Sequence, residues 1–512
     1  MIAQIFASLA TLVLAIFTSY AMLLGSGFFP QPDWAAIGIF SLFILLLSGD
    51  KKAFFAILLP LSLLYAFYTP VGMLFGPPSY QYVASVFATD LQEGKEFLSQ
   101  IPLQNFALAV GIIAAMLTIR WLVQKFSLTW LQNRGLQAVS FLAIFAFTPP
   151  AKFLLEGSDS LLKVRAELAR LNGMAIESQW GMSTLSANSR YDDYVLIIGE
   201  SARKDYHHAY GYPIENTPFM SRTNGTLING LTAAGTNTIA SLKLMLTQPD
   251  TAKWEGNYAL NLIDLIKSAG IRTYWISNQG YLGTFDTPIS SIANKSDEKF
   301  FTKSGDSFNQ NVSDFALLPK FDKVLQQPAS GKRFIVLHLY GSHPLSCDRL
   351  TDYPKLFKDE DLSPKHHNLN CYVSSIKKTD EMLEKVYQAL RHNQQSTGRS
   401  FSMVYFSDHG LSHQVSENSI DLLNTSKSKL HFDVPLFKIS SDDTQRNVHN
   451  AMKSGLNFTN GIANWIGIQN PKLNREIDLF SPQNDPSDYG LKAIIDKIEL
   501  PADPAVVIEP KK

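Results

Sequence analysis

Long apolar segments without charged side chains dominate the first 150 residues of the chain. Residues 1–32, 34–49, 53–89, 97–119 and 135–151 contain no Asp, Glu, Lys or Arg. A helix that crosses a bilayer needs roughly 20 mostly apolar residues. We therefore predict five membrane-spanning helices, at residues 2–24, 34–49, 53–75, 104–123 and 135–150.

Two other interpretations of these segments fit the pattern less well. Helices in the core of a soluble domain keep a polar face toward water, and these segments have almost none. A cleaved signal peptide begins with basic residues and has an apolar run of roughly 7–15 residues. Residues 2–24 follow no basic residue and form a longer apolar run, so we expect a retained span.

Basic side chains between the apolar segments predict the orientation of the chain in the membrane. The loops after the second and fourth segments hold five of them: Lys51, Lys52, Arg120, Lys125 and Arg134. The loops on the other side hold only Lys95. Because basic loops stay on the cytoplasmic side, we expect a multi-pass membrane protein with its N-terminus inside and the residues after 150 outside, which in a bacterium is the periplasm.

From residue 191 onward, short apolar runs alternate with segments of helical period. The predicted strands are 195–198, 273–276, 334–337, 403–406 and 434–439, and the predicted helices include 260–268, 312–325 and 373–391. This alternation is typical of an α/β domain with a mostly parallel sheet covered on both faces. The expected organisation is a five-helix transmembrane domain (1–150), a connector (151–190), the α/β domain (191–482) and a peripheral tail (483–512).

Charge and cysteine content narrow the class of protein further. The chain has 512 residues, with 45 basic and 45 acidic side chains. Clustered basic residues drive nucleic-acid binding, so this balance excludes nucleic acid as the expected partner. Cys347 and Cys371 are the only cysteines. Outside the cytosol, a disulfide between them would contribute about 3 kcal/mol; two free thiols are the alternative.

Polar side chains follow three of the predicted strands. Glu200 follows the first strand, the segment 338–343 contains two histidines after another, and Asp408 and His409 follow a third. Ligands bind beyond the carboxyl ends of strands in open α/β sheets. Two carboxylates and an imidazole, with one further donor, suit a tetrahedral Zn²⁺ site. The alternative is that these residues form unrelated caps and turns.

The segment 235–241 offers the further donor and a nucleophile. A Gly- and Thr-containing loop precedes an apolar stretch that could form a helix, and Thr238 lies near its start. The helix N-terminus favours an alkoxide or a phosphate, but a Thr hydroxyl needs a base or a metal to become nucleophilic. Thr238 could instead be the helix N-cap, and Ser201 is a rival nucleophile.

Several histidines could bind phosphate oxygens or carry a proton to or from a leaving group. The candidates are His338, His343, His413 and His431.

The residues discussed above belong to a pattern in which the whole chain resembles a known family. This family is the phosphoethanolamine transferases of the Gram-negative inner membrane, in the alkaline phosphatase/sulfatase superfamily. The motifs that carry the resemblance occur in order along the chain: Ile197–Arg203, Tyr210–Tyr212, Thr217–Pro218, Gly235–Thr238, Trp275–Asn278, Gly341–His343, Thr379–Asp380 and Ser407–Gly410. The resemblance implies the same outline of five spans, a connector and a sulfatase-like periplasmic domain.

The resemblance also implies roles for individual residues. Thr238 would be the nucleophile that becomes covalently modified. Zinc would be bound by Glu200, Thr238, Asp408 and His409. His343, together with Asn278 and either His413 or His431, would contact the phosphate or the substrate.

Departures from the family pattern bear on the lipid acceptor. The family's Asn-x3-Thr-x3-Glu pattern, which holds a lipid headgroup, corresponds here to Ser85, Thr89 and Glu93, so Ser replaces Asn. Many members that modify lipid A have Cys beside the nucleophile loop, where this chain has Ala234 and Leu244. The remaining cysteine pair makes the chain more similar to members that modify the lipopolysaccharide core.

The reaction implied by the resemblance is a zinc-dependent, ping-pong transfer. Phosphatidylethanolamine would donate phosphoethanolamine to Thr238, diacylglycerol would leave, and a lipopolysaccharide acceptor (core or lipid A) or another glycolipid would take the group. The alternatives are a related transferase that uses another headgroup, such as glycerol phosphate, or a glycan acceptor, and a non-catalytic membrane-anchored binding protein.

Overall fold

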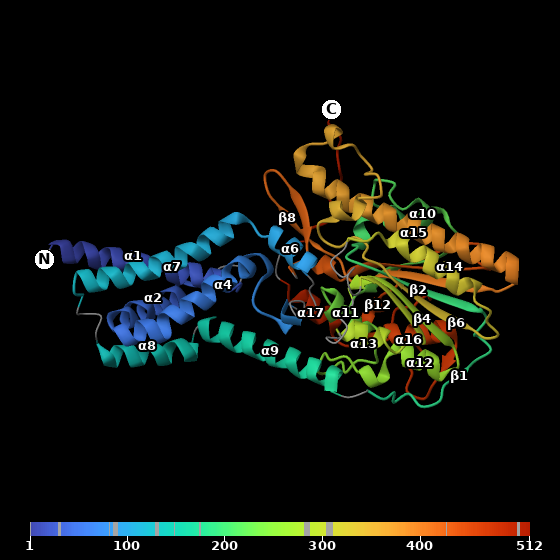
Figure 1. Cartoon of the computed structure of the whole chain (residues 1–512), viewed down its shortest axis with the longest axis horizontal. Coiled ribbons are helices and arrows are strands. Elements are labelled where there is room, and N and C mark those ends of the chain that lie inside the picture. The colour runs from blue at the N-terminus through green and yellow to red at the C-terminus, as the bar shows by residue number, and fades with distance from the viewer. Residues whose placement is uncertain are drawn as a thin grey trace. The chain divides into compact units, whose positions relative to one another are not determined.

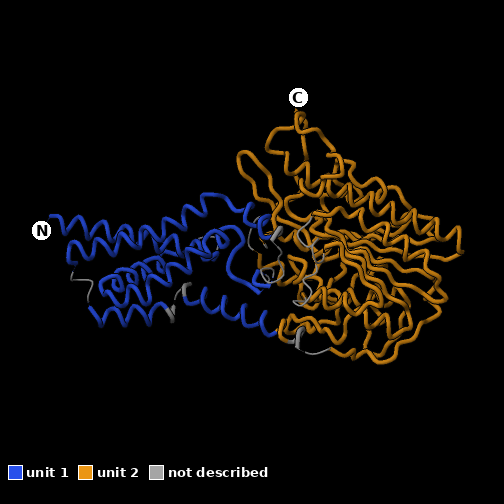
Figure 2. The backbone as a smooth tube through the Cα atoms, viewed as in Figure 1, with its two compact units in different colours: residues 1–87, 94–166 blue, residues 88–93, 167–512 orange. Residues whose placement is uncertain are grey.

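A computed structural model gives the fold of the chain. It describes residues 2–28, 32–80, 82–84, 91–128, 133–147, 149–173, 176–280, 287–303, 311–425, 427–498 and 502–511. The chain forms two compact units, one made of residues 1–87 and 94–166 and the other of residues 88–93 and 167–512 (Figure 2).

The first unit is helical. Its helical elements, some of which extend into the second unit, are α1 (Ile2–Gly25), α2 (Trp34–Gly49), α3 (Lys51–Ala53), η1 (Phe54–Leu58), α4 (Leu59–Phe75), α6 (Leu91–Ser99), α7 (Leu103–Lys125), α8 (Arg134–Phe147) and α9 (Pro149–Gly173). Among the described residues, three helical stretches are long and apolar enough to cross a membrane: Ile2–Gly25, Lys51–Phe75 and Leu103–Lys125. The other two predicted spans coincide with shorter apolar helices, Trp34–Gly49 and Arg134–Ile144.

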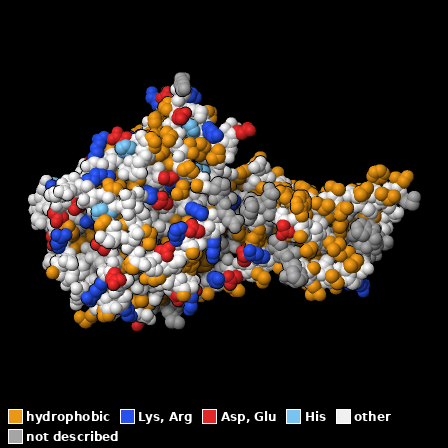
Figure 3. Space-filling model, turned by 180° about the vertical axis from the view of Figure 1, so that it is seen from behind, with side chains coloured by type: hydrophobic (Ala, Val, Ile, Leu, Met, Phe, Trp, Pro, Cys, Tyr) orange, Lys and Arg blue, Asp and Glu red, His pale blue; other side chains and the backbone are white. Residues whose placement is uncertain are grey.

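Apolar side chains lie both inside and outside this helical unit. Phe40, Phe54 and Tyr65 are buried between the helices, while Phe67 and Leu103 are largely exposed. Hydrophobic side chains cover much of the face of this unit that Figure 3 shows, whereas charged side chains are dense on the second unit. Apolar side chains on the outer face of a helical bundle are typical of helices that meet lipid.

The second unit is built on a nine-stranded sheet with the order β11-β3-β10-β7-β2-β6-β4-β5 and with β12 paired to β3. The strands are β2 (Asp193–Gly199), β3 (Gly225–Thr232), β4 (Arg272–Gly280), β5 (Glu298–Lys303), β6 (Arg333–His338), β7 (Phe401–Ser407), β10 (Asp433–Ser440), β11 (Arg446–His449) and β12 (Lys453–Ser454). Two small antiparallel pairs complete the strands: β1 (Thr184–Leu185) with β13 (Ile468–Gln469), and β8 (Ser412–Val415) with β9 (Ile420–Leu423).

The sheet is mixed, and among the described strands its departure from the predicted parallel arrangement is confined to β10. Strands β7, β2, β6, β4 and β5 are parallel to their neighbours in this run, but β10 is antiparallel to both β7 and β3. Between β7 and β10 the chain forms the β8–β9 hairpin and the short η11 turn (Lys429–His431). A parallel return usually needs a helical crossover, and without a helix in this connection β10 runs back antiparallel.

Helices cover both faces of this sheet (Figure 1). They are α10 (Pro218–Arg222), α11 (Thr238–Met245), α12 (Leu262–Ser268), α13 (Pro288–Ala293), α14 (Leu318–Gln326), α15 (His367–Thr397), α16 (Phe458–Ile466) and α17 (Leu491–Asp496). Leu196 and Ile198 of β2 pack in the core that includes α11, α12 and α16, while Val195 and Ile197 pack in the core that includes α14 and α15. This alternation explains why the strand is apolar throughout.

The predicted disulfide is confirmed. Cys347, in the η8 turn (Ser346–Leu350), is bonded to Cys371 near the start of α15. The bond fixes the turn that follows the Gly341–His343 loop to the longest helix of the second unit.

Candidate active site

Glu200 and Asp408 are brought together by the register of two parallel strands. Gly199 of β2 lies opposite Ser407 of β7, and each carboxylate belongs to the next residue along its strand. The Asp408 N–H donates to the Gly199 carbonyl at 3.1 Å, which ties the two strand ends together. Neighbouring parallel strands end at one edge of the sheet, as the sequence predicted.

Glu200, Asp408 and His409 form a group that could hold a metal ion. One ligand atom from each lies within 4.8 Å of the others, and all three side chains are buried. The His409 Nε2 atom lies 3.2 Å from Glu200 Oε1 and 3.5 Å from Asp408 Oδ2. The other ring nitrogen, Nδ1, bonds the Gly410 carbonyl at 2.8 Å, which leaves Nε2 to face the carboxylates.

The oxygens of Asp408 have different surroundings. Its Oδ1 accepts hydrogen bonds from the Ser201 N–H at 3.1 Å and the His409 N–H at 2.8 Å. Its Oδ2 is buried and accepts no hydrogen bond from the described residues. A buried carboxylate oxygen in this state favours a cation, because desolvating it without a partner is costly.

Protonation within the group points the same way. Burial and the Glu200 charge raise the pKa of Asp408. Burial lowers the pKa of His409, but the Asp408 and Glu200 carboxylates outweigh it and raise that pKa to about 9. Burial raises the pKa of Glu200, and His409 outweighs burial and lowers it. Protons on Asp408 and His409 thus offset the charge of the group while Glu200 stays ionised, and a cation that binds there would release protons.

Thr238 joins this group. Its Oγ1 donates a hydrogen bond to Glu200 Oε2 at 2.9 Å. Thr238 is the first residue of α11, and the N-cap is Asn237, whose side chain accepts from the Ala240 N–H at 2.8 Å. The interpretation of Thr238 as the N-cap is therefore wrong. The Ser241 hydroxyl donates to the Asp408 carbonyl at 2.6 Å, which fixes α11 to the loop that carries Asp408 and His409.

Ser201 and Thr238 differ in accessibility. The Ser201 hydroxyl donates to Glu200 Oε1 at 2.6 Å, so each oxygen of Glu200 accepts from one of the two hydroxyls. Ser201 is 0% exposed, whereas Thr238 is half-buried. Ser201 also has a φ of 59°, a strained conformation for a residue other than glycine that recurs at functional sites. Of the two residues, Thr238 is the one that is partly exposed to solvent.

Gln279 is a site residue that the sequence did not reveal. Its Nε2 donates to Glu200 Oε2 at 3.3 Å and to the Leu339 carbonyl at 2.7 Å. Its neighbour Asn278, the predicted substrate contact, donates to the Val312 carbonyl and to Asp314 Oδ1, both at 2.8 Å. The family motif Trp275–Asn278 ends one residue before Gln279, whose side chain contacts the metal-binding group.

The predicted histidines occupy two different surroundings. His431 lies beside His409, since the Nδ1 atoms of both rings bond the Gly410 carbonyl. His413 Nε2 instead lies 2.6 Å from the Tyr206 hydroxyl and 3.3 Å from an Arg203 Nη1. The structure therefore brings His431 to the metal-binding group and places His413 in another cluster.

His343 lies near Glu200 together with basic side chains that the sequence did not reveal. Its ring stacks on Tyr340 with 4.7 Å between centroids, and burial lowers the pKa of His343 to about 3. Lys303 Nζ lies 3.2 Å from the Tyr340 ring centroid, and Arg349 Cζ lies 4.5 Å from it. Lys303 and Arg349 belong to no motif, so only the fold shows that they converge on Tyr340.

Of the predicted lipid-headgroup residues, the structure describes only the backbone of Glu93. Ser85 and Thr89 lie outside the described residues, and so does the side chain of Glu93, whose backbone belongs to α6.

Comparison with known proteins defines the class first. The family model described as Sulfatase matches residues 192–468, which is most of the second unit. The chain is 57% identical, over 81% of its length and 86% of the relative's, to a Haemophilus influenzae protein named "Putative phosphoethanolamine transferase". It is 32% identical to phosphoethanolamine transferase OpgE of Escherichia coli, over 82% of this chain and 81% of that one. The chain therefore belongs to the phosphoethanolamine transferase family of the alkaline phosphatase/sulfatase superfamily, and it is a transferase enzyme.

A solved structure shares the fold of both units. It is the integral membrane lipooligosaccharide phosphoethanolamine transferase A (EptA) from Neisseria meningitidis, with a TM-score of 0.62 and 18% sequence identity. The match covers 92% of this chain and 98% of that one. A helical N-terminal region followed by a sulfatase-like α/β domain is thus the shared architecture.

Proposed function

We propose that this enzyme transfers phosphoethanolamine from phosphatidylethanolamine to a lipopolysaccharide acceptor, either the core or lipid A, through a covalent intermediate on Thr238. Its family supports phosphoethanolamine as the transferred group. The single observation that carries the proposal is the hydroxyl of the half-buried Thr238, which donates to a carboxylate of a buried group that could hold a metal ion. This contact supports Thr238 as the nucleophile.

Zinc is the metal that we propose for this group. Glu200, Thr238, Asp408 and His409 would hold it, and two carboxylates, an imidazole and a hydroxyl are oxygen and nitrogen donors that suit Zn²⁺. When bound, the metal lowers the pKa of the hydroxyl and neutralises charge on the phosphoryl oxygens.

The chain's own residues supply the nucleophile and move protons. In the first half, Thr238 Oγ1 forms a bond to phosphorus, the bond from phosphorus to the diacylglycerol oxygen breaks, and the proton that leaves Thr238 ends on that oxygen. In the second half, an acceptor oxygen bonds to phosphorus, the bond to Thr238 breaks, and the acceptor's proton returns to Thr238 Oγ1. His431 is the histidine that we assign to proton transfer, because it lies beside His409, its Nδ1 donates to the Gly410 carbonyl, and its Nε2 bonds no other described residue.

His343 and the first unit complete the proposal. His343 lies near Glu200 and would contact the phosphoryl group. The helical unit would hold the enzyme in the bacterial inner membrane with the second unit in the periplasm, where both lipid substrates are present. Ser85, Thr89 and Glu93 stay our prediction for the lipid headgroup. Membership of a family of transferases favours this function over a non-catalytic binding protein.

The test is to identify the modified residue. Purified, zinc-loaded protein is incubated with phosphatidylethanolamine that carries an isotopic label in its headgroup, and peptides are analysed by mass spectrometry. We expect one labelled phosphoethanolamine on Thr238, none in Thr238→Ala, and normal labelling in Ser201→Ala. An unlabelled wild-type protein would point to another donor, such as a glycerol phosphate lipid, and a labelled Thr238→Ala would exclude Thr238 as the nucleophile.

A further inference from the structure

The last described residues of the chain pack against the loops that carry the metal-binding side chains. We call residues 502–511 the C-terminal strap. The Tyr206 hydroxyl accepts from the Val506 N–H at 3.0 Å, and the Tyr212 hydroxyl donates to the Val506 carbonyl at 2.8 Å. Ile508 is 3% exposed and belongs to an apolar cluster with Tyr206 and Tyr212. The tail that the sequence analysis expected to be peripheral therefore includes a docked segment.

Asp503 is the polar centre of the strap. Its Oδ2 accepts from the His413 N–H at 2.9 Å and from an Arg203 Nη1 at 3.2 Å. Its Oδ1 accepts from the Ser428 hydroxyl, and its carbonyl accepts from Arg203 Nη2 at 2.7 Å. One side chain of the strap thus bonds three segments that are far apart in the sequence.

Arg203 links these contacts to the metal-binding group. It lies three residues after Glu200, and its side chain is 0% exposed. Its Nη1 donates to the Leu411 carbonyl at 3.3 Å, two residues after His409. The aliphatic part of the Arg203 side chain lies directly against the loop that carries Asp408 and His409. A Cβ atom added to Gly410 of that loop would lie only 2.7 Å from Arg203 Cγ.

Arg203 depends on two carboxylates for neutralisation. Asp205 bonds Nε at 3.0 Å and Nη2 at 2.6 Å, while Asp503 bonds the other terminal nitrogen, Nη1. Asp205 belongs to the same loop as Arg203, so its contacts hold the arginine within that loop only. Asp503 bonds Arg203 and the His413 backbone at once, so it joins the two loops from a third segment, beside the direct bonds of Ser201 to Asp408 and of Arg203 to Leu411.

We infer that Asp503 is a positioning residue: through Arg203 and His413 it holds the loop after Glu200 in register with the loop after His409, so that the metal-binding group is completed by the C-terminal strap. The inference rests on the proposed function for its link to zinc. Residues that orient the ligands of a metal commonly contribute a factor of roughly 10–100 to metal affinity.

The strap offers a matched control, because its apolar and polar anchors are separate. Ile508 is buried among apolar side chains and forms no polar contact with the ligand loops through its side chain. Ile508→Ala should loosen the strap's packing while Asp503 keeps its bonds to Arg203 and His413. Asp503→Ala should remove the bonds to Arg203 and His413 while the packing of Ile508 stays in place. Asp503→Glu keeps a carboxylate at this position and serves as the conservative rescue variant.

The experiment first measures hydrogen exchange of the full-length, metal-free proteins in detergent, in peptides that cover residues 200–203 and 408–413. The Ser201 N–H bonds Asp408 and the Gly410 N–H bonds the His431 carbonyl, so both amides report on the loops. We expect exchange in both peptides to rise at least about tenfold in Asp503→Ala, to stay near wild type in Ile508→Ala and to be partly restored in Asp503→Glu. A zinc titration of the same proteins should then show affinity lowered roughly 10-fold to 100-fold in Asp503→Ala and within about twofold in Ile508→Ala.

The outcomes separate this inference from the proposed function. Unchanged exchange in both loops of Asp503→Ala, or equal effects of Asp503→Ala and Ile508→Ala on exchange and zinc affinity, would overturn the positioning role. A different result is faster exchange in the loops of Asp503→Ala together with a wild-type protein that binds no zinc. That result would support the role of Asp503 in joining the loops and would refute the proposed zinc chemistry.

Discussion

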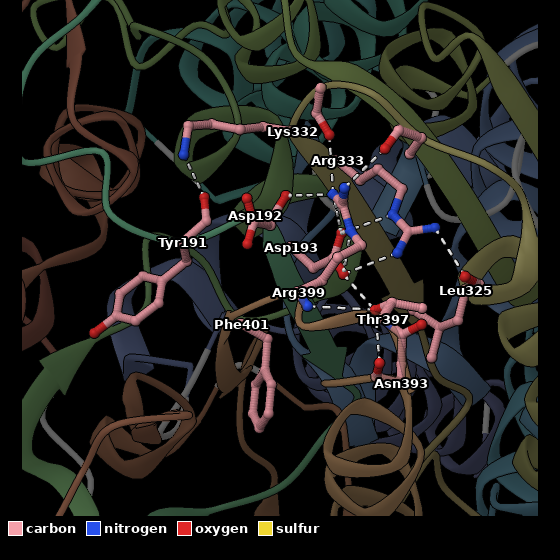
Figure 4. Close-up of polar contacts among 12 residues, drawn as sticks. Tyr191, Asp192, Asp193, Leu325, Lys332, Arg333, Asn393, Thr397, Arg399 and Phe401 are labelled. Atoms are coloured by element: carbon pink, nitrogen blue, oxygen red, sulfur yellow. Dashed lines mark hydrogen bonds and ion pairs between the residues drawn. The ribbon is translucent and has the colours of Figure 1, made fainter. Parts of the chain in front are cut away.

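The two ends of strand β2 both bury charged side chains, but they neutralise them in different ways. At the first end, Asp193 Oδ1 and Oδ2 bond Arg333 Nε and Nη2 at 2.7 and 2.8 Å, and Arg399 Nη2 bonds Oδ1 at 2.8 Å (Figure 4). At the other end, no Lys or Arg within the described ranges forms an ion pair with Glu200 or Asp408. Because buried carboxylates need neutralisation and His409 is one group beside two of them, this difference supports the metal ion that we propose for the second end.

Acidities at the two ends differ accordingly. Burial raises the pKa of Asp193, but the bonds and charges of Arg333 and Arg399 outweigh it and hold that pKa below its ordinary value. Burial and the nearby Glu200 raise the pKa of Asp408 instead. The first end is an ion network of one aspartate and two arginines that supports the fold, whereas at the second end the basic group beside the two carboxylates is the His409 imidazole.

The largest effect should follow from removing charge at the second end. We expect Glu200→Gln to lose bound zinc and to lower the transfer rate by at least about 10³-fold, since the metal supplies several kcal/mol of charge stabilisation. Elemental analysis of the purified protein and a labelled-lipid transfer assay measure the two losses. Glu298→Gln, which alters a partly exposed acid on β5, should change neither. A Glu200→Gln protein with one zinc per chain and normal turnover would show that the Glu200 charge is needed for neither the metal nor the reaction. The proposed difference between the two ends of β2 would then be wrong.

Removing charge at the first end should affect stability and leave chemistry intact. Arg333→Met leaves Asp193 buried with Arg399 alone, and we expect it to lower the free energy of unfolding by about 3 kcal/mol. The matched control is Arg272→Met, because Arg272 lies opposite Arg333 in the β4–β6 register but is 60% exposed in its pair with Glu298. That change should cost less than about 1 kcal/mol.

Thermal and denaturant unfolding, with zinc content measured beside them, test this prediction. The folded fraction of Arg333→Met should bind zinc as the wild type does. Loss of zinc from folded Arg333→Met protein would show that the two ends of the strand are one coupled site.

The sequence was sufficient for residues whose position follows from a strand end. Glu200, Asp408 and His409 each follow an apolar strand directly, and parallel strands end at one edge, so their convergence could be predicted. The apolar N-terminal helices and the cysteine pair were predictable for similar reasons: composition and compartment determine them.

Residues that reach the site through tertiary packing could not be predicted in this way. Gln279 and Asn278 are neighbours in β4, and only the strand's twist and pairing decide which side chain meets Glu200. Asp503 lies 300 residues from its partner Arg203, in a tail whose Pro- and Lys-rich composition resembles a peripheral segment. The antiparallel direction of β10 likewise depends on a connection without a crossover helix.

Acid should weaken the two ends of β2 unequally. His207 is 1% exposed, and its Nδ1 bonds the carbonyl of Arg203, near the site end of the strand. Burial lowers the pKa of His207 to about 4, so between about pH 6.5 and 4 the folded state binds fewer protons than the unfolded state. The stability that neutral His207 provides is complete above pH 6.5 and is lost as the pH falls toward 4, by up to about 3 kcal/mol.

His207→Phe should therefore flatten the fall in unfolding midpoint between pH 7.5 and 4.5, and His392→Phe, at an exposed position of α15, should leave it as in the wild type. His338 and His431 are also buried with lowered pKa values, so His207→Phe removes only part of the acid sensitivity. Asp193 stays ionised and paired over this range, because its pKa lies below the ordinary value of 3.8. An acid response that His207→Phe does not change would place the loss of stability elsewhere, and an equal flattening by Arg333→Met would mean that the paired end is the one that acid opens.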